Sequence, residues 1–336
     1  MSLDTTLRAA VIGLGKAGSR FDEDKSPPRW SHVGAYLACP SDFRVIGGAD
    51  PSADARDRFA KRCPDARVVD DPVALVAETK PDVISVCTPP AGRSELVQRM
   101  LRAHVPRVVA CEKPLEVDDR AREELVRACA TANVPLVVNY TRRFETAWRS
   151  ARRAIADGRI GRVVSITVRA PNRLWSIGSH AIDTLTYLAG GPPQRWYAEP
   201  RPSLVEMDEP AADAVFVFGG DVVGHLITTG MRAVIIFEAD IIGSDGRIQV
   251  LDNGARSTLS RYAAYSSFGT ATTGDVEVIA TRESDFSPFV EMVEEIALVA
   301  RGRLDAASST GANAVVTESL LSSIAAQCTS DPRRNQ

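Results

Sequence analysis

The stretch Leu7-Arg-Ala-Ala-Val-Ile-Gly13-Leu-Gly15-Lys-Ala-Gly18 decides the fold of the first part of the chain. Its first six residues are mostly apolar and predict a buried strand, and the glycines after them have the spacing Gly-x-Gly-x-x-Gly. Glycines at this spacing allow a tight turn, a close approach of the backbone to a pyrophosphate and close packing of the next helix. Amide groups at the N-terminus of that helix bind phosphate oxygens. The stretch therefore predicts a strand, a turn and a helix that bind a dinucleotide.

An acidic residue, Asp50, ends the next apolar run, residues 43–49. A carboxylate at this place accepts hydrogen bonds from the ribose hydroxyls of NAD and repels the 2′-phosphate of NADP. The sequence therefore favours NAD, and NADP stays possible because Arg56 is near. Asp50 lies 32 residues after Gly18 rather than the usual ~20, and we interpret the stretch 21–31 as a loop insertion. In isolation, an Asp before a proline also fits a simple turn.

Apolar runs continue to alternate with helical patterns as far as residue 140. The runs 83–87, 107–111 and 135–139 predict strands, and helical patterns lie between them. Continuous apolar strands that alternate with helices are typical of a parallel sheet covered by helices on both faces. The sequence therefore predicts a doubly wound α/β domain over residues 1–140, which binds the dinucleotide.

The pattern changes in residues 141–336, which we expect to form a second α/β domain. A strand is predicted at 163–170, and further strands follow with short turns and no helices between them, at 214–218, 222–229, 233–240 and 247–251. Short turns join antiparallel strands, so this sheet is expected to be mainly antiparallel. Two of the runs are apolar on both faces, whereas a sheet with one solvated face alternates. We therefore expect helices on one face and a second subunit on the other, in a homodimer or homotetramer.

The composition excludes several classes of protein. The 336 residues include 40 Lys+Arg and 43 Asp+Glu, a net charge of −3, which argues against a nucleic-acid partner. No uncharged apolar run approaches the ~18 residues of a membrane span, and the start does not resemble a signal peptide. We therefore expect a cytoplasmic protein without a membrane partner. The six cysteines form no C-x-x-C pair, and no cluster has the spacing of metal ligands, so we expect reduced thiols and no metal.

A short motif, Glu112-Lys113-Pro114, follows the strand 107–111. It stands at the edge where ligands of open parallel sheets bind. A lysine there can stay charged and stabilise a developing alkoxide, or it can lose its proton if it is desolvated. Taken alone, Lys113 also fits a surface lysine before a turn. Lysines are scarce in this chain, and none follows Lys113.

A second motif, Ser179-His180-Ala-Ile-Asp183, begins a predicted helix. Ser179 is expected to cap the helix, which places His180 in the first turn and Asp183 three residues later on the same face. The helix dipole disfavours a charged imidazole there and suits His180 as a general base near neutral pH. A structural histidine at a helix start is the simpler alternative. We interpret the remaining histidines, at positions 32, 104 and 225, as structural.

Taken together and in order, these motifs resemble one family over nearly the whole chain. The chain resembles the glucose-fructose oxidoreductase / inositol dehydrogenase group, the Gfo/Idh/MocA family. The matching elements are, in order, Gly13-Leu-Gly-Lys-Ala-Gly18, His32-x-x-Ala35, Asp50-Pro51, Thr88-Pro89, Glu112-Lys113-Pro114, Arg142-Arg-Phe144 and Gly178-Ser-His180-Ala-Ile-Asp183. The Glu-Lys-Pro and Gly-x-His-x-x-Asp elements are more specific than the glycine loop.

The resemblance implies a Rossmann domain followed by an α/β domain with an open-faced, mainly antiparallel sheet. It implies an NAD(P)-dependent oxidoreductase that interconverts a secondary alcohol and a ketone on a sugar or cyclitol ring, and the acidic stretches 206–213 and 291–295 would suit an amino sugar. The implied catalytic residues are Lys113, His180 and Asp183. The implied cofactor-binding residues are Gly13, Leu14, Gly15, Lys16, Ala17, Gly18, Asp50, Thr88, Pro89, Glu112 and Lys113. The implied substrate-binding residues are Lys113, Arg142, Asn172, Arg173, Trp175, Ser176 and His180.

Two positions depart from the family pattern. Ser176 stands where many dehydrogenases of this group carry an Asp four residues before the histidine, and Arg93 stands where a His often follows Thr-Pro. A serine cannot carry a negative charge near pH 7. Two alternatives therefore stay open: an NAD-dependent glycosidase that uses a transient oxidation, and a non-catalytic relative that binds dinucleotide or sugar. The presence of both Lys113 and His180 disfavours the second.

Overall fold

The chain folds into two compact units. The computed structural model describes residues 5–24, 28–171, 173–201, 209–230, 235–265 and 270–330. The first unit comprises residues 1–144 and 284–315, and the second comprises residues 145–283 and 316–336. The sequence predicts a second domain that runs without a break from residue 141, whereas in the structure the segment 284–315 returns to the first unit.

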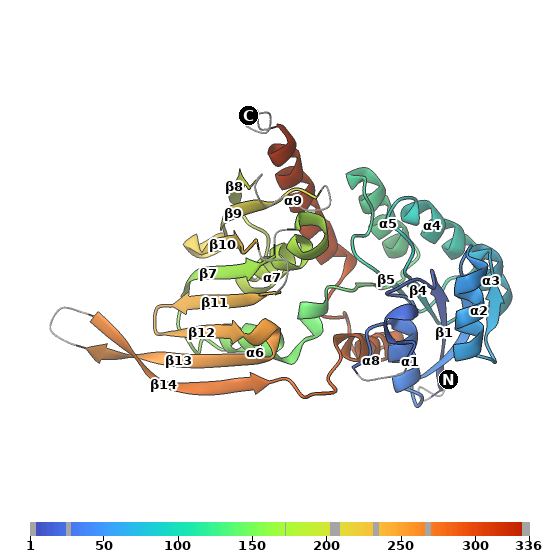
Figure 1. Cartoon of the computed structure of the whole chain (residues 1–336), viewed down its shortest axis with the longest axis horizontal. Coiled ribbons are helices and arrows are strands. Elements are labelled where there is room, and N and C mark those ends of the chain that lie inside the picture. Colours follow the sequence, from blue (N-terminus) through green and yellow to red (C-terminus); the bar gives the residue numbers. More distant parts are fainter. Residues whose placement is uncertain are drawn as a thin grey trace. The chain divides into compact units, whose positions relative to one another are not determined.

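The first unit contains a six-stranded sheet in which all neighbouring strands are parallel (Figure 1). Its strands are β1 (Leu7–Ile12), β2 (Phe43–Ala49), β3 (Arg67–Val69), β4 (Val83–Val86), β5 (Val108–Cys111) and β6 (Leu136–Val138). They lie in the order β3-β2-β1-β4-β5-β6, so the direction of winding reverses between β1 and β4. Ligands of such sheets bind at this reversal, beyond the carboxyl ends of the strands. The predicted doubly wound fold is confirmed.

Helices and apolar clusters cover both faces of this sheet. The helices are α1 (His32–Ala38), α2 (Ala53–Arg62), α3 (Pro72–Thr79), α4 (Arg93–Ala103), α5 (Asp119–Thr131) and α8 (Pro288–Ala300). The apolar face of α8, with Phe289, Met292 and Val293, packs into the same cluster as Tyr36 of α1. This packing brings the segment 284–315 into the first unit. An apolar helix face in the sequence does not reveal which core it joins.

The glycine turn does not lead directly into α1, because a segment is looped out of the helix. The His32 amide donates to the Ala17 carbonyl (2.9 Å) and the Val33 amide donates to the Gly18 carbonyl (3.0 Å). These are the bonds that residues 21 and 22 would make in a helix that ran straight on from Gly18, so about eleven residues are inserted. Without the insertion, Asp50 would stand at the usual distance of ~20 residues after the last glycine. The interpretation of a loop insertion is confirmed, and the regular helix starts later than predicted.

A buried carboxylate anchors the inserted segment, which contains a 3-10 turn at Arg20–Asp22. Asp22 is 2% exposed and accepts hydrogen bonds from the Trp30 amide (2.8 Å) and from the amide and hydroxyl of Ser31 (3.0 and 2.6 Å). It also pairs with Arg62 of α2 at 2.6 Å. Because Ser31 in turn caps α1 by accepting from the Gly34 amide (3.0 Å), the ion pair holds the start of α1 in place.

The second unit contains an eight-stranded sheet in the order β14-β13-β12-β11-β7-β10-β9-β8. Its strands are β7 (Val163–Ala170), β8 (Arg195–Pro200), β9 (Ala212–Val217), β10 (Val223–Thr228), β11 (Glu238–Gly243), β12 (Gly246–Leu251), β13 (Arg256–Tyr265) and β14 (Thr270–Thr281), with 3-10 turns at Gly219–Asp221 and Asp252–Gly254. Only β7 and β10 pair in parallel among these described strands. The prediction of a mainly antiparallel sheet is confirmed.

Two details of the predicted strands in this sheet are wrong. The strand expected at 233–240 begins only at Glu238; residues 233 and 234 lie outside the described ranges, and residues 235–237 precede the strand. Strands β8, β13 and β14 have no counterpart in the prediction. They are rich in Arg, Ser, Thr and Tyr, so they lack the apolar runs by which the other strands are recognised.

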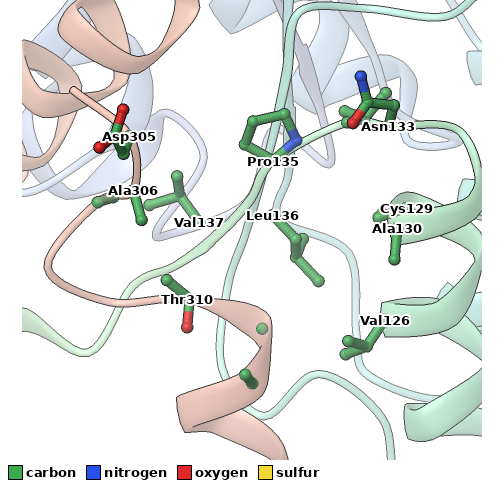
Figure 2. A pocket seen from close by; sticks show the side chains of 14 residues that line it. Val126, Cys129, Ala130, Asn133, Pro135, Leu136, Val137, Asp305, Ala306 and Thr310 are labelled. Atoms are coloured by element: carbon green, nitrogen blue, oxygen red, sulfur yellow. The ribbon is translucent and has the colours of Figure 1, made fainter. Parts of the chain in front are cut away.

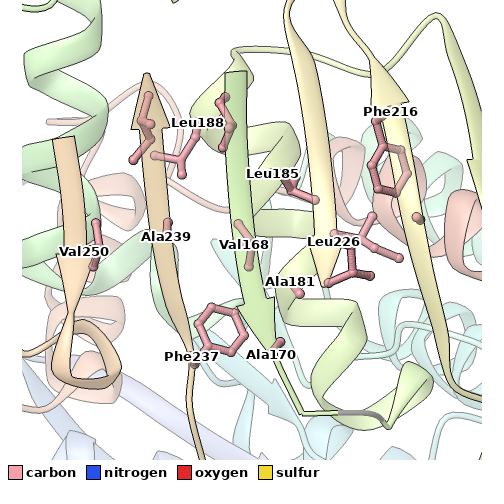
Figure 3. Packing of buried hydrophobic residues seen from close by; sticks show 14 of the residues in the cluster. Val168, Ala170, Ala181, Leu185, Leu188, Phe216, Leu226, Phe237, Ala239 and Val250 are labelled. Carbon is pink, nitrogen blue, oxygen red and sulfur yellow. The ribbon is translucent and has the colours of Figure 1, made fainter. Parts of the chain in front are cut away.

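Helices cover one face of the second sheet. They are α6 (Thr146–Ala156), α7 (Ser179–Ala189) and the part of α9 (Gly311–Ser330) that follows residue 315. Figure 3 shows Leu185 and Leu188 of α7 in one cluster with Val168 and Phe216 of the sheet. The face turned away from these helices is mixed rather than fully apolar. Across the described residues, every helix is too short or too polar to span a membrane.

Candidate functional site

The glycine turn has the shape that its motif predicts. Gly13 adopts a positive φ of +86°, and a Cβ atom on it would lie 2.8 Å from the Thr88 amide nitrogen. A Cβ on Gly18 would lie 2.0 Å from the Gly13 carbonyl oxygen, so neither position tolerates a side chain. Around Gly15, by contrast, no atom of the described residues lies within 4 Å of the place of a Cβ. The turn is therefore closed against β4 and open at Gly15, where a pyrophosphate would approach.

Asp50 lies beside this turn, at the end of β2. Its Oδ2 accepts a hydrogen bond from the Leu14 amide (2.7 Å), and its Oδ1 accepts one from the Ser52 amide (2.8 Å). Each carboxylate oxygen can accept a second hydrogen bond, so Asp50 keeps the capacity to bind ribose hydroxyls. The Arg56 guanidinium lies close by and donates to the carbonyls of Asp50 (2.8 Å) and Pro51 (3.0 Å).

Glu112, at the end of β5, is the centre of a buried polar network. Its Oε1 accepts a hydrogen bond from Asn139 (2.7 Å) and lies 3.2 Å from Nε2 of His32. The other ring nitrogen of His32 lies 2.9 Å from the Ser85 hydroxyl, which in turn bonds the Tyr36 hydroxyl at 2.8 Å. The network joins α1, β4, β5 and the segment after β6. His32, which is fully buried, is structural as predicted.

The network keeps Glu112 charged. Burial acts to raise the pKa of the Glu112 carboxyl, but hydrogen bonds from His32 and Asn139 and the charges of His32 and Lys113 outweigh it and hold the pKa below its ordinary value. A negative Glu112 therefore stands directly before Lys113 in the loop that follows β5. The charge of Lys113 helps to lower the pKa of Glu112, so the two opposite charges stabilise each other.

Arg93 fastens the loop after β4 to the loop after β5. This residue of α4 is 2% exposed, and its guanidinium donates to the carbonyl oxygens of Thr88, Glu112 and Pro114. Both loops carry residues predicted to bind the cofactor, and the sequence analysis missed this connection. A signal was present, because a positive charge in the first turn of a helix is unfavourable unless the side chain has another partner.

The helix that carries His180 begins earlier than predicted. A wider, π-helical turn at Leu174–Gly178 runs into α7 without a break, and the amides of Ile177 and Gly178 both donate to the Arg173 carbonyl (3.0 and 2.7 Å). Ser179 therefore does not cap the helix; its hydroxyl donates to the Ser176 carbonyl at 3.1 Å. His180 lies beyond the first turn of the continuous helix, where the dipole effect expected on its imidazole is weaker.

Asp183, one turn after His180, accepts a hydrogen bond from a residue of α9. It is 1% exposed, and its Oδ1 accepts a hydrogen bond from the Thr317 hydroxyl at 3.2 Å. His180 is half-buried, and its carbonyl accepts from the Thr184 hydroxyl at 2.7 Å. The helix thus presents a histidine and a carboxylate at the predicted spacing of three residues.

A carboxylate that the sequence analysis did not single out bonds the π-helical turn. Both the amide and the hydroxyl of Ser176 donate to Oε2 of Glu209, at 3.1 and 3.2 Å. The next residue, Pro210, accepts a hydrogen bond from the Leu174 amide at 3.1 Å. Glu209 lies more than thirty residues along the chain, so only its position in an acidic stretch could have drawn attention to it.

The other predicted residues divide between the two units. Thr88, Pro89, Lys113 and Arg142 belong to the first unit, where Arg142 lies in the 3-10 turn Thr141–Phe144 and donates to the Thr141 hydroxyl at 2.8 Å. Lys16 is exposed and Ala17 half-buried in the glycine turn. Arg173 and Trp175 flank or lie in the π-helical turn of the second unit and are half-buried. Asn172 lies outside the described residues.

A cavity of about 540 Å³ in the first unit is not part of this site (Figure 2). Its lining is mainly apolar and comes from the end of α5, from β6 and from the start of α9, with Val126, Pro135 and Thr310 among the contributors. Pro135 precedes β6, so the cavity reaches the amino edge of the parallel sheet, whereas the motifs stand at its carboxyl edge. Within the described residues, no three His, Cys, Asp or Glu side chains are placed to hold a metal ion together, and none of the six cysteines forms a disulfide.

Comparison with known proteins agrees with this geometry. Residues 7–140 match the Gfo/Idh/MocA family, described as an oxidoreductase family with an NAD-binding Rossmann fold. The match identifies residues 7–140 as an NAD-binding Rossmann domain of this family. It is 32% identical over 175 residues to the inositol 2-dehydrogenase of Rhizobium meliloti (strain 1021), covering 50% of this chain and 46% of that protein. It is 25% identical over 205 residues to the D-glucoside 3-dehydrogenase of Escherichia coli (strain K12), covering 55% of each.

The chain thus spans about half the length of these curated relatives. A solved structure covers much more of it. The WlbA dehydrogenase from Bordetella pertussis, in complex with NADH and UDP-GlcNAcA, superposes with a TM-score of 0.74 over 97% of both chains, at 17% identity. At this identity the likeness establishes the fold alone.

The charged state of Glu112 predicts a pH-dependent contribution to stability. We expect Glu112→Gln to lower the free energy of unfolding at pH 7 by roughly 1–3 kcal/mol, because the network loses a charged acceptor. The pKa of Glu112 is lowered in the folded protein, so its contribution is complete above the ordinary carboxyl pKa of 4.5 and is lost as the pH falls through the lowered value. Urea unfolding of the wild type and the variant at several pH values between 7 and 3 measures the difference.

The expected result is a difference between the two proteins that shrinks below pH 4.5. A difference of the same size at every pH would mean that the charge of Glu112 plays no part. Glu123→Gln is the matched control, because Glu123 is 60% exposed on α5 and its removal should change stability little.

Proposed function

We propose that this chain is an NAD(P)-dependent dehydrogenase that interconverts a secondary alcohol and a ketone on the ring of a sugar, amino sugar or cyclitol. The observation that carries the proposal is the grouping of three features at the carboxyl edge of the parallel sheet. These are the glycine turn that is open at Gly15, the Asp50 carboxylate beside it, and Lys113 at the end of β5. Inositol 2-dehydrogenase and D-glucoside 3-dehydrogenase, the named relatives, support the class of substrate.

The residues present fit a dinucleotide. The amides of the turn Gly13–Gly18 would hold the pyrophosphate, and Asp50 would accept hydrogen bonds from the adenosine ribose. Thr88, Pro89, Glu112 and Lys113, in the two loops joined by Arg93, would border the nicotinamide half. When bound, the nicotinamide ring supplies a donor or acceptor of hydride.

Residues of the chain transfer the proton of the reacting hydroxyl and stabilise the negative charge on its oxygen. The positive Lys113 ammonium stabilises negative charge on the carbinol oxygen. An imidazole nitrogen of His180 takes the hydroxyl proton in the oxidation and returns it in the reduction. Asp183, which Thr317 holds in place, orients His180 or a substrate hydroxyl. Substrate binding is assigned to Arg142, Asn172, Arg173, Trp175 and Ser176.

The first test measures turnover. The purified protein is mixed with NAD⁺ and with myo-inositol, D-glucose or methyl β-D-glucopyranoside, and reduction of the nicotinamide is followed by absorbance. We expect turnover with at least one ring alcohol, and Lys113→Met should reduce kcat by roughly 10²- to 10⁴-fold while the Kd for NAD changes only a few-fold. Lys61→Met, at an exposed site on α2, is the control.

A fully active Lys113→Met variant would remove Lys113 from the mechanism. If no ring alcohol reduces NAD⁺ but p-nitrophenyl glucosides release nitrophenol without net NADH, the dehydrogenase proposal is overturned in favour of a glycosidase.

A second test concerns the choice of dinucleotide. We expect the wild type to bind NAD(H) more tightly than NADP(H), because the Asp50 carboxylate bonds ribose hydroxyls and repels a 2′-phosphate. Asp50→Ala should weaken NADH binding by roughly 10- to 100-fold, the effect of losing a hydrogen bond to a charged group. Fluorescence titration with NADH and NADPH measures both affinities. Asp54→Ala, four residues later and exposed, should change neither; equal affinities of the wild type for both dinucleotides would contradict the assignment of Asp50.

A third test concerns assembly through the second sheet. On the face opposite its helices, Tyr197, Val215 and Ile227 are 58%, 39% and 41% exposed, beside polar residues such as Thr167. We propose that this mixed face pairs with a second copy in a homodimer or homotetramer. Light scattering should then give at least twice the 36.2 kDa of one chain, and Ile227→Asp should shift the mass toward one chain. Val164→Asp, on the helix-covered side, is the control; a monomeric wild type would refute the pairing.

A further inference from the structure

Glu209 brings a carboxylate to the helix that carries His180. Its Oε2 accepts hydrogen bonds from the amide and the hydroxyl of Ser176, at 3.1 and 3.2 Å. Ser176 precedes His180 by four residues, and the π-helical turn continues into α7 without a break. Residues on successive turns of a helix lie near one another on one side of it. The negative charge of Glu209 is therefore fixed one turn before the histidine.

The backbone that follows Glu209 bonds both the π-helical turn and the residue after β8. Pro210 accepts the Leu174 amide at 3.1 Å, and Ala211 accepts the Arg201 amide at 2.8 Å. The backbone next to Glu209 is therefore held in place, and two donors on Ser176 hold its Oε2. Two hydrogen bonds to one oxygen fix the orientation of the whole carboxylate group.

The second oxygen of this carboxylate is available to a ligand. Among the residues that the structure describes, both hydrogen bonds of Glu209 involve Oε2. Arg201, which lies close by in the structure because its amide bonds the Ala211 carbonyl, pairs with Asp213 instead. The residue is only half-buried, so an incoming molecule can reach it. A half-buried carboxylate with an unused acceptor oxygen binds donors such as hydroxyl groups well, because hydrogen bonds to a charged acceptor are about twice as strong as neutral ones.

We propose that Glu209 is a substrate-binding residue of this enzyme, and the inference rests on the proposed function. Its Oε1 accepts a hydrogen bond from a ring hydroxyl adjacent to the carbinol that gives its proton to His180. Ser176 acts as the positioning residue that holds Oε2. The substrate class that fits is a ring with neighbouring hydroxyl groups, because the reacting hydroxyl and the bound one must both be present.

Glu209→Gln tests the charge while it keeps the shape of the side chain. We expect kcat/KM for the best ring alcohol of the panel to fall roughly 10- to 100-fold, mostly through a higher KM. The Kd for NADH, measured by fluorescence, should stay within about twofold, because the glycine turn and Asp50 belong to the other unit. Isothermal titration of the same ring alcohol into the protein with NADH should show a matching loss of affinity. Glu277→Gln, which removes an exposed carboxylate paired with Arg159 in the same unit, should change none of these values.

A rescue experiment separates substrate binding from support of the helix. Glu209→Ala should lose at least as much kcat/KM as Glu209→Gln. Adding Ser176→Asp returns a carboxylate to the same turn, and we expect the double variant to recover at least about tenfold over Glu209→Ala. If Glu209 only stabilised the π-helical turn, both single variants would lower the Tm and leave KM unchanged, and adding Ser176→Asp would not change KM either.

The outcomes distinguish this inference from the proposed function. A wild type that reduces no NAD⁺ with any ring alcohol would overturn the proposed function. A wild type that is active, together with a Glu209→Gln variant whose KM and affinity for the ring alcohol equal those of the wild type, would overturn the role of Glu209 alone. A higher KM, unchanged binding of NADH and recovery in the double variant would establish it.

Discussion

The first unit depends on keeping one carboxylate, Glu112, charged inside the protein. A buried charge is costly unless it is paired and hydrogen-bonded, and here His32 and Asn139 supply the donors. Because these partners come from α1 and from the segment after β6, the carboxylate fixes the ends of elements that are distant in sequence. The loop with Lys113 begins at the same residue, so the network that stabilises the sheet edge also fixes the start of the loop that carries the candidate catalytic lysine.

Arg93 and the glycine turn hold together the other loops at the carboxyl edge of the parallel sheet. The guanidinium of Arg93 binds carbonyl oxygens of both loops that border the predicted nicotinamide half, and Gly13 lets β1 approach β4 closely at Thr88. Neither contact involves a side chain expected to touch a substrate. Arg93, one of the two departures from the family pattern, therefore holds the two loops together, and the glycine turn is intact.

Local patterns in the sequence predicted much of the fold. Contacts between residues that are far apart along the chain could not be predicted from it. The glycine turn, the parallel strands and Asp50 follow from neighbouring residues, and so did the inserted loop. The assignment of α8 to the first unit, the start of the helix before Ser179 and the bond between Ser176 and Glu209 depend on partners far along the chain. Strands β13 and β14 were missed because polar residues dominate them, and the sheet forms through pairing rather than through an apolar run.

The surroundings of Lys113 differ from those of the other lysines. The sequence leaves two roles open for it, a fixed positive charge and a lysine that loses its proton. Of the lysines in the described ranges, Lys16, Lys61 and Lys80 are exposed, and Lys113 alone is half-buried. Lys113 directly follows the negative Glu112, and the two opposite charges stabilise each other. A lysine that stays positive acts on a developing alkoxide as a fixed charge. It cannot at the same time accept the proton of the hydroxyl, so the chemistry needs a separate base, which His180 supplies in the proposed mechanism.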